Sequence, residues 1–492
     1  MKKQILALLS LGMFSGMVGA QTKPAAAKPQ NLELKVHVNG LTSGEMLLAH
    51  YYANQNKVID TAKVDAKGNV VFKKNEPAPG GIYLVVFPSK RHFECIIADE
   101  QKFSLDVPDT NDIINSIKVT GSKENIAFYE YQRYMMKEQK KVEPLQAALK
   151  SAKERNNKDS ANLITKQITE IDSAVKVYKR DFYKKSHPET FMAKVLSAMD
   201  EPDNIPYEKC PKKADGTIDS TYNYRNFKAH YWDGFDFNDE RLIRTPVYYN
   251  KMKFWLEKLS HPHPDSVIQN VDWLIEKTRP SKELFKYTVS YTTYTYETSK
   301  IMGYDAIFVH IVNKYYKTNQ CWWVSEENKA KVIKRSDQLS YTLLGKYAVN
   351  LMLKDTSDKP VTLQSVQGQY TVVIFWDPTC SHCKHDIPLL KAYYDSLNTA
   401  GIKFNVYAIY SEMDTPTWKK YIKDNKLNWV NVHSNDKTEL GTAKYYYDVY
   451  STPTLYLLDE NKKIIGKRFD VENMKPFLNR KIEEDKKKAA GR

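Results

Sequence analysis

The stretch that decides the fold is Trp376-Asp-Pro-Thr-Cys380-Ser-His-Cys383-Lys-His-Asp386-Ile-Pro388, which places two cysteines three residues apart. The chain has 492 residues and only five cysteines. This number is too small for the disulfide framework that holds small secreted domains together. The pair could bind a metal, attach a haem, form a structural disulfide or exchange electrons.

The residues around the pair argue against haem attachment, structural zinc and peroxidase chemistry. A c-type haem requires histidine directly after the second cysteine, where this chain has Lys384. A structural zinc site requires a second ligand pair, which the sequence lacks, and His382 and His385 lie too close to the thiols to complete a tetrahedron. A peroxiredoxin would have threonine three positions before its reactive cysteine, where Asp377 precedes Cys380. Dithiol–disulfide exchange remains.

The residues on either side of the pair predict a β-α-β unit. Residues 370–376 form an apolar run typical of a buried strand, and residues 403–410 form another. Between them, apolar side chains recur at helical spacing, at Leu389, Leu390, Tyr393, Tyr394 and Leu397. The two thiols therefore lie where a strand ends and a helix begins.

Their positions on this helix predict different roles for the two thiols. The first turn of a helix has unpaired N–H groups and the positive end of the helix dipole, which both favour thiolate over thiol. We therefore expect Cys380 to be the exposed nucleophile and Cys383 the buried resolving thiol. His382 between them either tunes the redox potential or is an exposed turn residue with no electronic role. Cys95 and Cys321 are expected to be small buried apolar side chains.

The chain upstream of the pair divides into two regions of different pattern. Residues 32–120 alternate apolar and polar side chains between frequent turn signals, which predicts a small antiparallel β-sandwich. Residues 121–346 carry apolar side chains at helical spacing, which predicts a mainly α-helical domain. Within it, residues 156–160 would join the two helices of an amphipathic hairpin. Residues 287–296 are interpreted as helix, although their residue types favour strands.

The first twenty residues predict export. Residues 1–20 combine a basic start, an apolar run too short to span a bilayer comfortably and a small-residue pattern ending at Ala20. These features are typical of a cleaved signal peptide, with a retained N-terminal anchor as the alternative. Residues 21–31 are predicted to be a flexible leader, residues 347–480 the α/β domain and residues 481–492 a charged tail. We expect an exported protein in a bacterial periplasm.

The charge distribution argues against nucleic acid as a partner. The net charge is +15, but the sequence has no dense basic stripe with interleaved aromatic side chains. The predicted export of the protein also argues against a nucleic-acid partner. The positive excess fits solubility or loose contact with anionic surfaces.

The sequence also resembles a known family. Phe375-Trp376, the cysteine pair, Pro388 and the later run Ser451-Thr-Pro-Thr454 are similar to the periplasmic TlpA/ResA-like thiol–disulfide oxidoreductases, which have the thioredoxin fold. The resemblance covers about residues 347–480. It implies a cis peptide bond before Pro453, a substrate segment paired with the backbone of Thr452, and no small-molecule cofactor or metal. It implies protein substrates with cysteines or disulfides and a reductant in the membrane. The implied substrate-binding residues are Trp376, Pro378, Thr452 and Pro453.

One position departs from this family. Thioredoxins have a buried acid six residues before the nucleophile, where this chain has Ile374. Asp386 matches the acid that follows the cysteine pair in ResA-like members, which implies a proton relay for Cys383. Otherwise Asp386 is a common acid near a helix N-terminus. The upstream regions resemble a β domain and a helical domain of unknown function that accompany such proteins, the helical one through residues 231–246.

Three functions remain open. The first is electron exchange with protein cysteines through a mixed disulfide at Cys380, in a reducing, oxidising or isomerising direction. The second is a copper chaperone on the same fold, with the thiolates and His433 as ligands. The third makes residues 21–345 a binding module that recruits a partner, with the thioredoxin domain as an accessory.

Overall fold

The computed structural model describes residues 31–491. The expected signal peptide (1–20) and all but the last residue of the expected leader (21–31) lie outside the described residues. The chain forms two compact units, with the boundary between Met199 and Asp200. Over the described range, no helix has the length and apolar character needed to cross a membrane.

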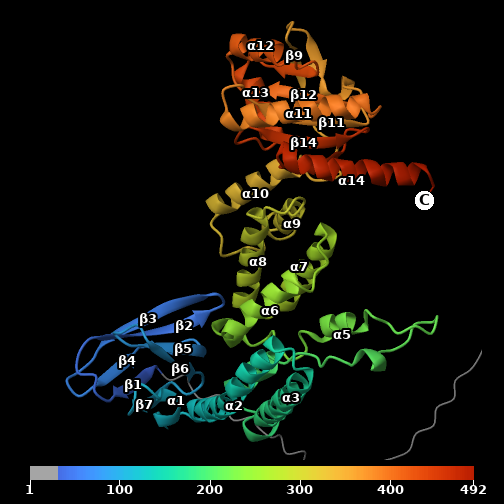
Figure 1. The fold of residues 1–492 in the computed structure, drawn as a ribbon. Helices are drawn as coiled ribbons and strands as arrows, with labels where there is room; N and C mark the ends of the chain where they lie inside the picture. The colour runs from blue at the N-terminus through green and yellow to red at the C-terminus, as the bar shows by residue number, and fades with distance from the viewer. Residues whose placement is uncertain (1–30, 492) are drawn as a thin grey trace, which may run out of the picture. The chain divides into compact units, whose positions relative to one another are not determined.

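The first unit contains the predicted β-sandwich, made of two four-stranded sheets (Figure 1). One sheet has the order β4 (Asn69–Lys73), β1 (Glu33–Val38), β7 (Lys102–Val107) and β8 (Lys118–Thr120). The other has the order β3 (Gln55–Lys63), β2 (Glu45–Tyr52), β5 (Gly81–Val86) and β6 (His92–Ile97). Alternate residues of β1 point into the core, which is why the sequence alternates. One detail is corrected: β1 and β7 pair in parallel, while the other described pairs of the sandwich are antiparallel.

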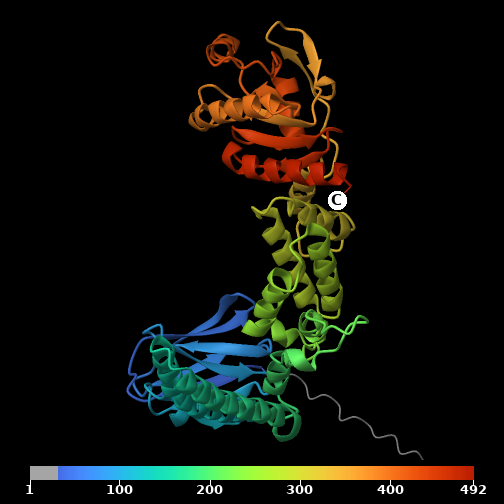
Figure 2. The same cartoon turned by 45° about the vertical axis from the view of Figure 1, so that its right-hand side comes forward.

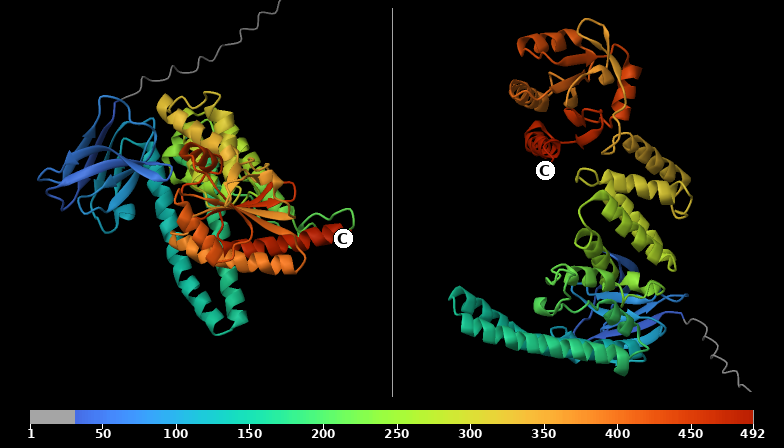
Figure 3. Two further views of the ribbon diagram at one scale, coloured as in Figure 1. Left: turned by 90° about the horizontal axis from the view of Figure 1, so that it is seen from above. Right: turned by 90° about the vertical axis from the view of Figure 1, so that its right-hand side faces the viewer.

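Helices follow the sandwich within the same unit: α1 (Ile113–Ser116), α2 (Lys123–Glu154), α3 (Lys158–Asp181), a π-helical turn (Phe182–Ser186) and α4 (Phe191–Ala198). The side-chain amide of Asn125 in α2 exchanges two hydrogen bonds with the backbone of Ile96, at 2.8 and 2.7 Å. α2 and α3 form the predicted hairpin (Figure 3), and Asn157 caps α3 by accepting from the Ser160 N–H. These helices therefore belong with the sandwich, so the helices between 121 and 346 do not form one compact unit.

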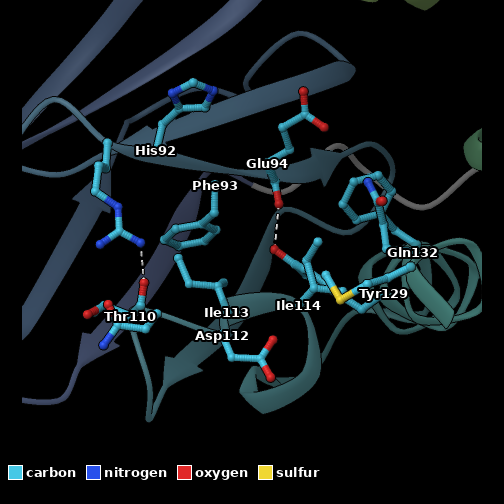
Figure 4. Close-up of a pocket in the computed structure, with 13 residues that line it drawn as sticks. His92, Phe93, Glu94, Thr110, Asp112, Ile113, Ile114, Tyr129 and Gln132 are labelled. Atoms are coloured by element: carbon cyan, nitrogen blue, oxygen red, sulfur yellow. Dashed lines mark hydrogen bonds between the residues drawn. The ribbon is translucent and has the colours of Figure 1, made fainter. Parts of the chain in front are cut away.

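A cavity of about 350 Å³ lies in this unit, where β6 faces α1 and α2 (Figure 4). The Tyr129 hydroxyl donates to the Glu94 carbonyl at 2.6 Å across it. The guanidinium of Arg91, which also lines the cavity, donates to the Thr110 carbonyl. The first hydrogen bond joins β6 to α2, and the second joins the turn before β6 to the segment between β7 and β8.

The second unit begins with helices whose core is aromatic. They are a 3₁₀ turn (Tyr207–Lys209), α5 (Tyr222–His230), a second 3₁₀ turn (Glu240–Arg244), α6 (Pro246–Glu257), α7 (Pro264–Thr278), α8 (Lys282–Glu297), α9 (Asp305–Ile311), a π-helical turn (Val312–Tyr316) and α10 (Glu326–Ser340). Trp232, Tyr248 and Trp255 pack together in this core. The ambiguous run 287–296 is helical, as interpreted. Its threonine hydroxyls bond to carbonyls one turn back, as Thr292 does to Thr288, so that these polar groups are satisfied inside the core.

The rest of the second unit is the predicted α/β domain (Figure 2). Its seven-stranded sheet has the order β10 (Pro360–Thr362), β9 (Met352–Asp355), β13 (Val430–His433), β12 (Phe404–Tyr410), β11 (Tyr370–Trp376), β14 (Thr454–Asp459) and β15 (Ile464–Lys467). Its helices are α11 (Ser381–Thr399), α12 (Thr415–Asp424), α13 (Lys437–Tyr446) and α14 (Val471–Ala489), with a 3₁₀ turn at Leu363–Ser365. β11 lies parallel to β12 and antiparallel to β14.

Every residue of β11 is buried, because helices cover both faces of the sheet. Ile374 and Trp376 pack in the core that includes α11 and α14. Phe375 packs in the core on the other face, which includes α13. The strand therefore delivers the cysteine pair from the rigid centre of the domain.

The charged tail expected at 481–492 is corrected by α14, which continues to Ala489. Ile482 is buried in the core on that face. Asp485 accepts a hydrogen bond from the Tyr370 hydroxyl at 2.8 Å. The basic residues near its end suit a helix C-terminus, which explains why charge alone suggested a tail.

Candidate active site

The two cysteines lie at the junction of β11 and α11. Cys380 is the N-cap of α11, and its carbonyl accepts the helical hydrogen bond from the Lys384 N–H at 3.0 Å. The preceding turn is held by Asp377, whose carboxylate accepts from the Thr379 N–H at 2.9 Å. Cys380 is partly exposed, whereas Cys383 is fully buried. The predicted exposed and buried positions are confirmed.

The surroundings of the two sulfur atoms move their pKa values in opposite directions. Partial burial works to raise the pKa of Cys380, but hydrogen bonds from the N–H of Cys383, the Thr452 side chain, the Cys383 thiol and the N–H of His382 outweigh it, so that the pKa is lowered. Burial raises the pKa of Cys383 to about 12, although the Asp377 N–H lies 3.5 Å from its sulfur. Cys380 is therefore the thiol that ionises first.

The loop before β14 lies beside Cys380. The peptide bond between Thr452 and Pro453 is cis. The Cys380 thiol donates to the Thr452 carbonyl at 3.3 Å, and both loop residues are half-buried. The pairing of Phe375 with Thr454 in the sheet brings this loop to the end of β11. Two segments separated by about seventy residues thus meet at one sulfur atom.

Two residues expected to contact substrate do not do so through their side chains. Trp376 is completely buried, and its ring packs 5.4 Å from that of Tyr421. Within residues 31–491, its Nε1 has no hydrogen-bond partner. Pro378 is also buried. The substrate-binding role expected for Trp376 and Pro378 is corrected accordingly, because strand β11 and its turn point both side chains inward.

Asp386 lies on the buried side of α11, one turn after Cys383. Its side chain is almost fully buried and accepts a hydrogen bond from His385 Nδ1 at 3.0 Å. This bond raises the pKa of His385 against a small opposing effect of desolvation. In the described part of the chain, no hydrogen bond joins the Asp386 carboxylate to the Cys383 thiol. Ile374, which replaces the buried acid of thioredoxins, is a core residue.

A cavity of about 720 Å³ opens beside the dithiol. It brings together four of the predicted site residues, His382, Asp386, Thr452 and Pro453. It also has walls that sequence reasoning missed, formed by Arg335, His385, Asp448, Tyr450, Arg468, Phe469, Asp470 and Glu472. Arg335 comes from α10 of the helical region, and no motif in the sequence connects it with the cysteines.

The structure does not bring His433, which the copper hypothesis requires, into this cavity. His433 is buried in β13, where its Nε2 lies 3.2 Å from Asp358 and its ring packs 5.1 Å from Trp418. Over residues 31–491, no three histidine, cysteine, aspartate or glutamate side chains are placed to hold a metal ion.

The three other cysteines are buried. Burial raises the pKa of Cys321 to about 12 and that of Cys95 further still. Both are thus inert apolar side chains, as predicted.

Three family models match the chain. A thioredoxin-like model matches residues 368–464. Two domains of unknown function match residues 32–128 (DUF4369) and 150–342 (DUF5106).

The curated relatives each match a quarter of this chain or less. The chain is 23% identical over 124 residues to the thiol-disulfide oxidoreductase ResA of Bacillus cereus, which is 25% of this chain and 68% of that protein. It is 29% identical over 99 residues to the sporulation thiol-disulfide oxidoreductase A of Bacillus subtilis, which is 20% of this chain and 58% of that protein. The match to ResA of Bacillus subtilis covers 64% of that protein. The chain therefore spans about six tenths of the length of these relatives.

Among solved structures, a domain of a possible thiol-disulfide isomerase from Cytophaga hutchinsonii is 38% identical. The match covers 30% of this chain and 97% of that domain, with a TM-score of 0.27 over the whole chain. Residues 368–464 thus form a thioredoxin-like domain, in which a partly exposed and a buried cysteine follow the strand that lies between β12 and β14, and the chain is similar to the ResA thiol–disulfide oxidoreductases.

Proposed function

We propose that this protein exchanges electrons with the cysteines of other proteins through Cys380 and Cys383. The observation that carries this proposal is the difference in accessibility and pKa between the two thiols. Cys380 is accessible and has a lowered pKa, so it is the group that attacks a disulfide. Cys383 is buried beside it with a raised pKa, so it stays protonated until the second step.

In the reducing direction, the Cys380 thiolate attacks one sulfur of a substrate disulfide. A mixed disulfide forms, and the second substrate sulfur leaves as a thiolate that takes a proton from water. Cys383 then loses its proton and attacks the Cys380 sulfur, which releases the substrate as a dithiol. Two electrons pass from the cysteine pair to the substrate, and the pair becomes a disulfide.

The reverse sequence oxidises a substrate dithiol, and an external dithiol or disulfide partner restores the pair in either case. Asp386 is the candidate acceptor for the Cys383 proton, because it is the carboxylate one helical turn away on the buried face of α11. The N-terminal sequence supports a periplasmic location. There the partner would be a membrane reductant.

A covalent trap tests the proposal. Cys383→Ala removes the resolving thiol and should accumulate mixed disulfides between Cys380 and substrate proteins. They should run as high-mass species on non-reducing gels and disappear with dithiothreitol. Cys380→Ala is the matched control and should trap nothing. Equal behaviour of the two variants would refute the proposal.

The reduction potential of the pair measures the direction of the reaction. Dithiol reductants lie near about −270 mV and strong oxidants near about −120 mV. The hydrogen bonds that favour the Cys380 thiolate stabilise the reduced form, so the couple should lie on the oxidising side of about −270 mV. Equilibration with glutathione or a dithiol of known potential, read by mass, gives the value.

A further inference from the structure

The cavity beside Cys380 has one wall that the thioredoxin domain does not supply. Arg335 projects into it from α10, within the region that matches a domain of unknown function. His382 and Asp386 of α11 line the same cavity. The loop with Thr452, whose carbonyl accepts from the Cys380 thiol, lines it as well. The helical region thus reaches the place where a substrate segment would approach the nucleophile.

α10 holds the residue two positions before Thr452. The Tyr450 hydroxyl donates to the side-chain amide oxygen of Gln338 at 2.9 Å. Arg335 lies one helical turn earlier, with Nη1 at 3.3 Å from the same hydroxyl and its guanidinium 5.4 Å from the ring centre. Tyr450 is 74% exposed even though the Arg335 guanidinium lies over its ring, so much of this side chain remains accessible to a ligand.

Arg335 also anchors the start of this loop. Its guanidinium pairs with both oxygens of Asp448, and the second of these oxygens accepts from Arg468 as well. The Asp448 side chain is 1% exposed, and a buried carboxylate requires such partners. Asp448 has a φ of +50°, a left-handed conformation that these contacts hold in place.

A second, buried ion pair fastens the helical region to the same side of the sheet. Lys467 of β15 pairs with Asp305 of α9 and donates to the Thr342 carbonyl at 2.6 Å. The Lys467 side chain is almost completely buried. The helical region is therefore attached to the thioredoxin-like domain at two places, Asp448 and Lys467. These directional contacts set the position of α10 relative to the loop.

The charged groups of the cavity fall into two sets by their pairing. Four carboxylates and two guanidiniums line it. The two guanidiniums both pair with Asp448, which balances that carboxylate. The remaining carboxylates, Asp386, Asp470 and Glu472, have His385 as their basic neighbour. This second set therefore carries an excess of acidic groups, although the chain as a whole is basic.

We propose that this cavity binds the polypeptide segment that flanks the substrate cysteine, with α10 as one wall, and that it favours a lysine or arginine near that cysteine. In this arrangement Arg335 is a positioning residue, which acts through Tyr450 and Asp448. Tyr450 offers an exposed aromatic side chain to the segment, and Glu472, whose side chain is 67% exposed, offers a carboxylate to its cation. The inference rests on the proposed dithiol exchange and adds the class of substrate.

Two disulfide peptides and one small disulfide test the inference on the full-length protein. The peptides are identical except for lysine or glutamate two residues from the cysteine, and the small substrate is bis(2-hydroxyethyl) disulfide. We expect the lysine peptide to have a kcat/KM about fivefold higher, because one charge near a carboxylate at a wet site has that effect. Glu472→Gln should reduce this ratio about twofold, whereas Glu483→Gln, also exposed on α14 but outside the cavity, should not change it.

Arg335→Ala and Tyr450→Ala test whether the wall formed by α10 contributes to binding of the peptide. Both should raise KM for the peptides about fivefold to tenfold and leave turnover of the small disulfide and alkylation of Cys380 unchanged. Lys331→Ala on the exposed side of α10 is the control. Arg335→Lys should recover part of the effect, since it restores the charge without the two-pronged contact. Because Tyr450 is exposed, Tyr450→Ala remains informative if Arg335→Ala unfolds.

The outcomes separate this inference from the proposed function. Equal losses with peptide and small disulfide, or equal kcat/KM for the two peptides, would overturn the cavity inference while leaving dithiol exchange in place. A protein that reduces neither peptide nor small disulfide, and whose Cys383→Ala variant traps nothing, would overturn the proposed function itself.

Discussion

Two regions of the active site differ sharply although their two cysteines lie within one turn of α11. The rim, defined by Cys380, His382 and Thr452, is partly open, and N–H and hydroxyl donors there favour a thiolate. The floor, defined by Ile374, Cys383 and Asp386, is buried, and desolvation there favours a thiol. A step of three residues along α11 thus separates a nucleophile from a resolving group. The role of each cysteine is set by its surroundings and not by its residue type.

The largest expected effect that tests this contrast is on alkylation by iodoacetamide. Cys383→Ala reports Cys380 alone, and Cys380→Ala reports Cys383 alone. The pKa of Cys380 is lowered from the ordinary value of a thiol, whereas that of Cys383 is raised to about 12. At pH 7 the thiolate fractions then differ by about 10³-fold or more, and the rates should follow.

The pH dependence has a definite sign. Because a thiol loses its proton as pH rises, both rates should increase with pH, and the Cys380 rate should level off at a lower pH than the Cys383 rate, whose thiol has a pKa of about 12. Peptide mass mapping assigns the label and excludes the buried Cys95, Cys210 and Cys321. Rates within tenfold of each other at pH 7 would break the distinction between rim and floor.

Much of this contrast could be predicted from the sequence because it is local. A strand pattern followed by a helical one fixes where α11 begins, and helix geometry then assigns the exposed and buried positions to Cys380 and Cys383. Residues 287–296 are predicted as helix for another local reason, which is that they lie between helical segments and contain no turn residues. The β-sandwich followed from alternation along strands such as β1.

What the sequence could not predict depends on contacts between distant segments. Arg335 reaches the site only through the packing of α10, more than forty residues before the dithiol. Trp376 looked available to substrate, but strand direction buries it. Residues 481–489 looked like a tail because their charge is visible and the burial of Ile482 is not. The parallel pairing of β1 with β7 is likewise a matter of topology, since alternation is the same in either direction.

A smaller effect is expected from Asp386→Asn, which changes the charge of the floor and keeps its shape. If this carboxylate accepts the Cys383 proton, resolution of the mixed disulfide should slow by about 10²-fold, the lower end for general acid–base catalysis. The lower end applies because Asp386 bonds to His385 and not to the thiol. Alkylation of Cys380 should stay unchanged, and Asp395→Asn on the exposed face of α11 is the control. Stopped-flow release from a preformed mixed disulfide measures the step, and an unchanged rate would leave Asp386 a structural acid.

The smallest effect is expected at the rim, from His382→Ala. The group of His382 that contacts the Cys380 sulfur is its backbone N–H, which alanine retains. The imidazole is exposed, and a charge about 4 Å away in water contributes only about 1 kcal/mol, or about fivefold. The Cys380 alkylation rate at pH 7 should therefore fall by less than about fivefold, with Lys384→Ala as an exposed control on the same turn. A fall beyond tenfold would show that the imidazole, and not the helix N-terminus, sets the reactivity of the rim, and it would restore the redox-tuning role suggested by the residue's place between the two cysteines.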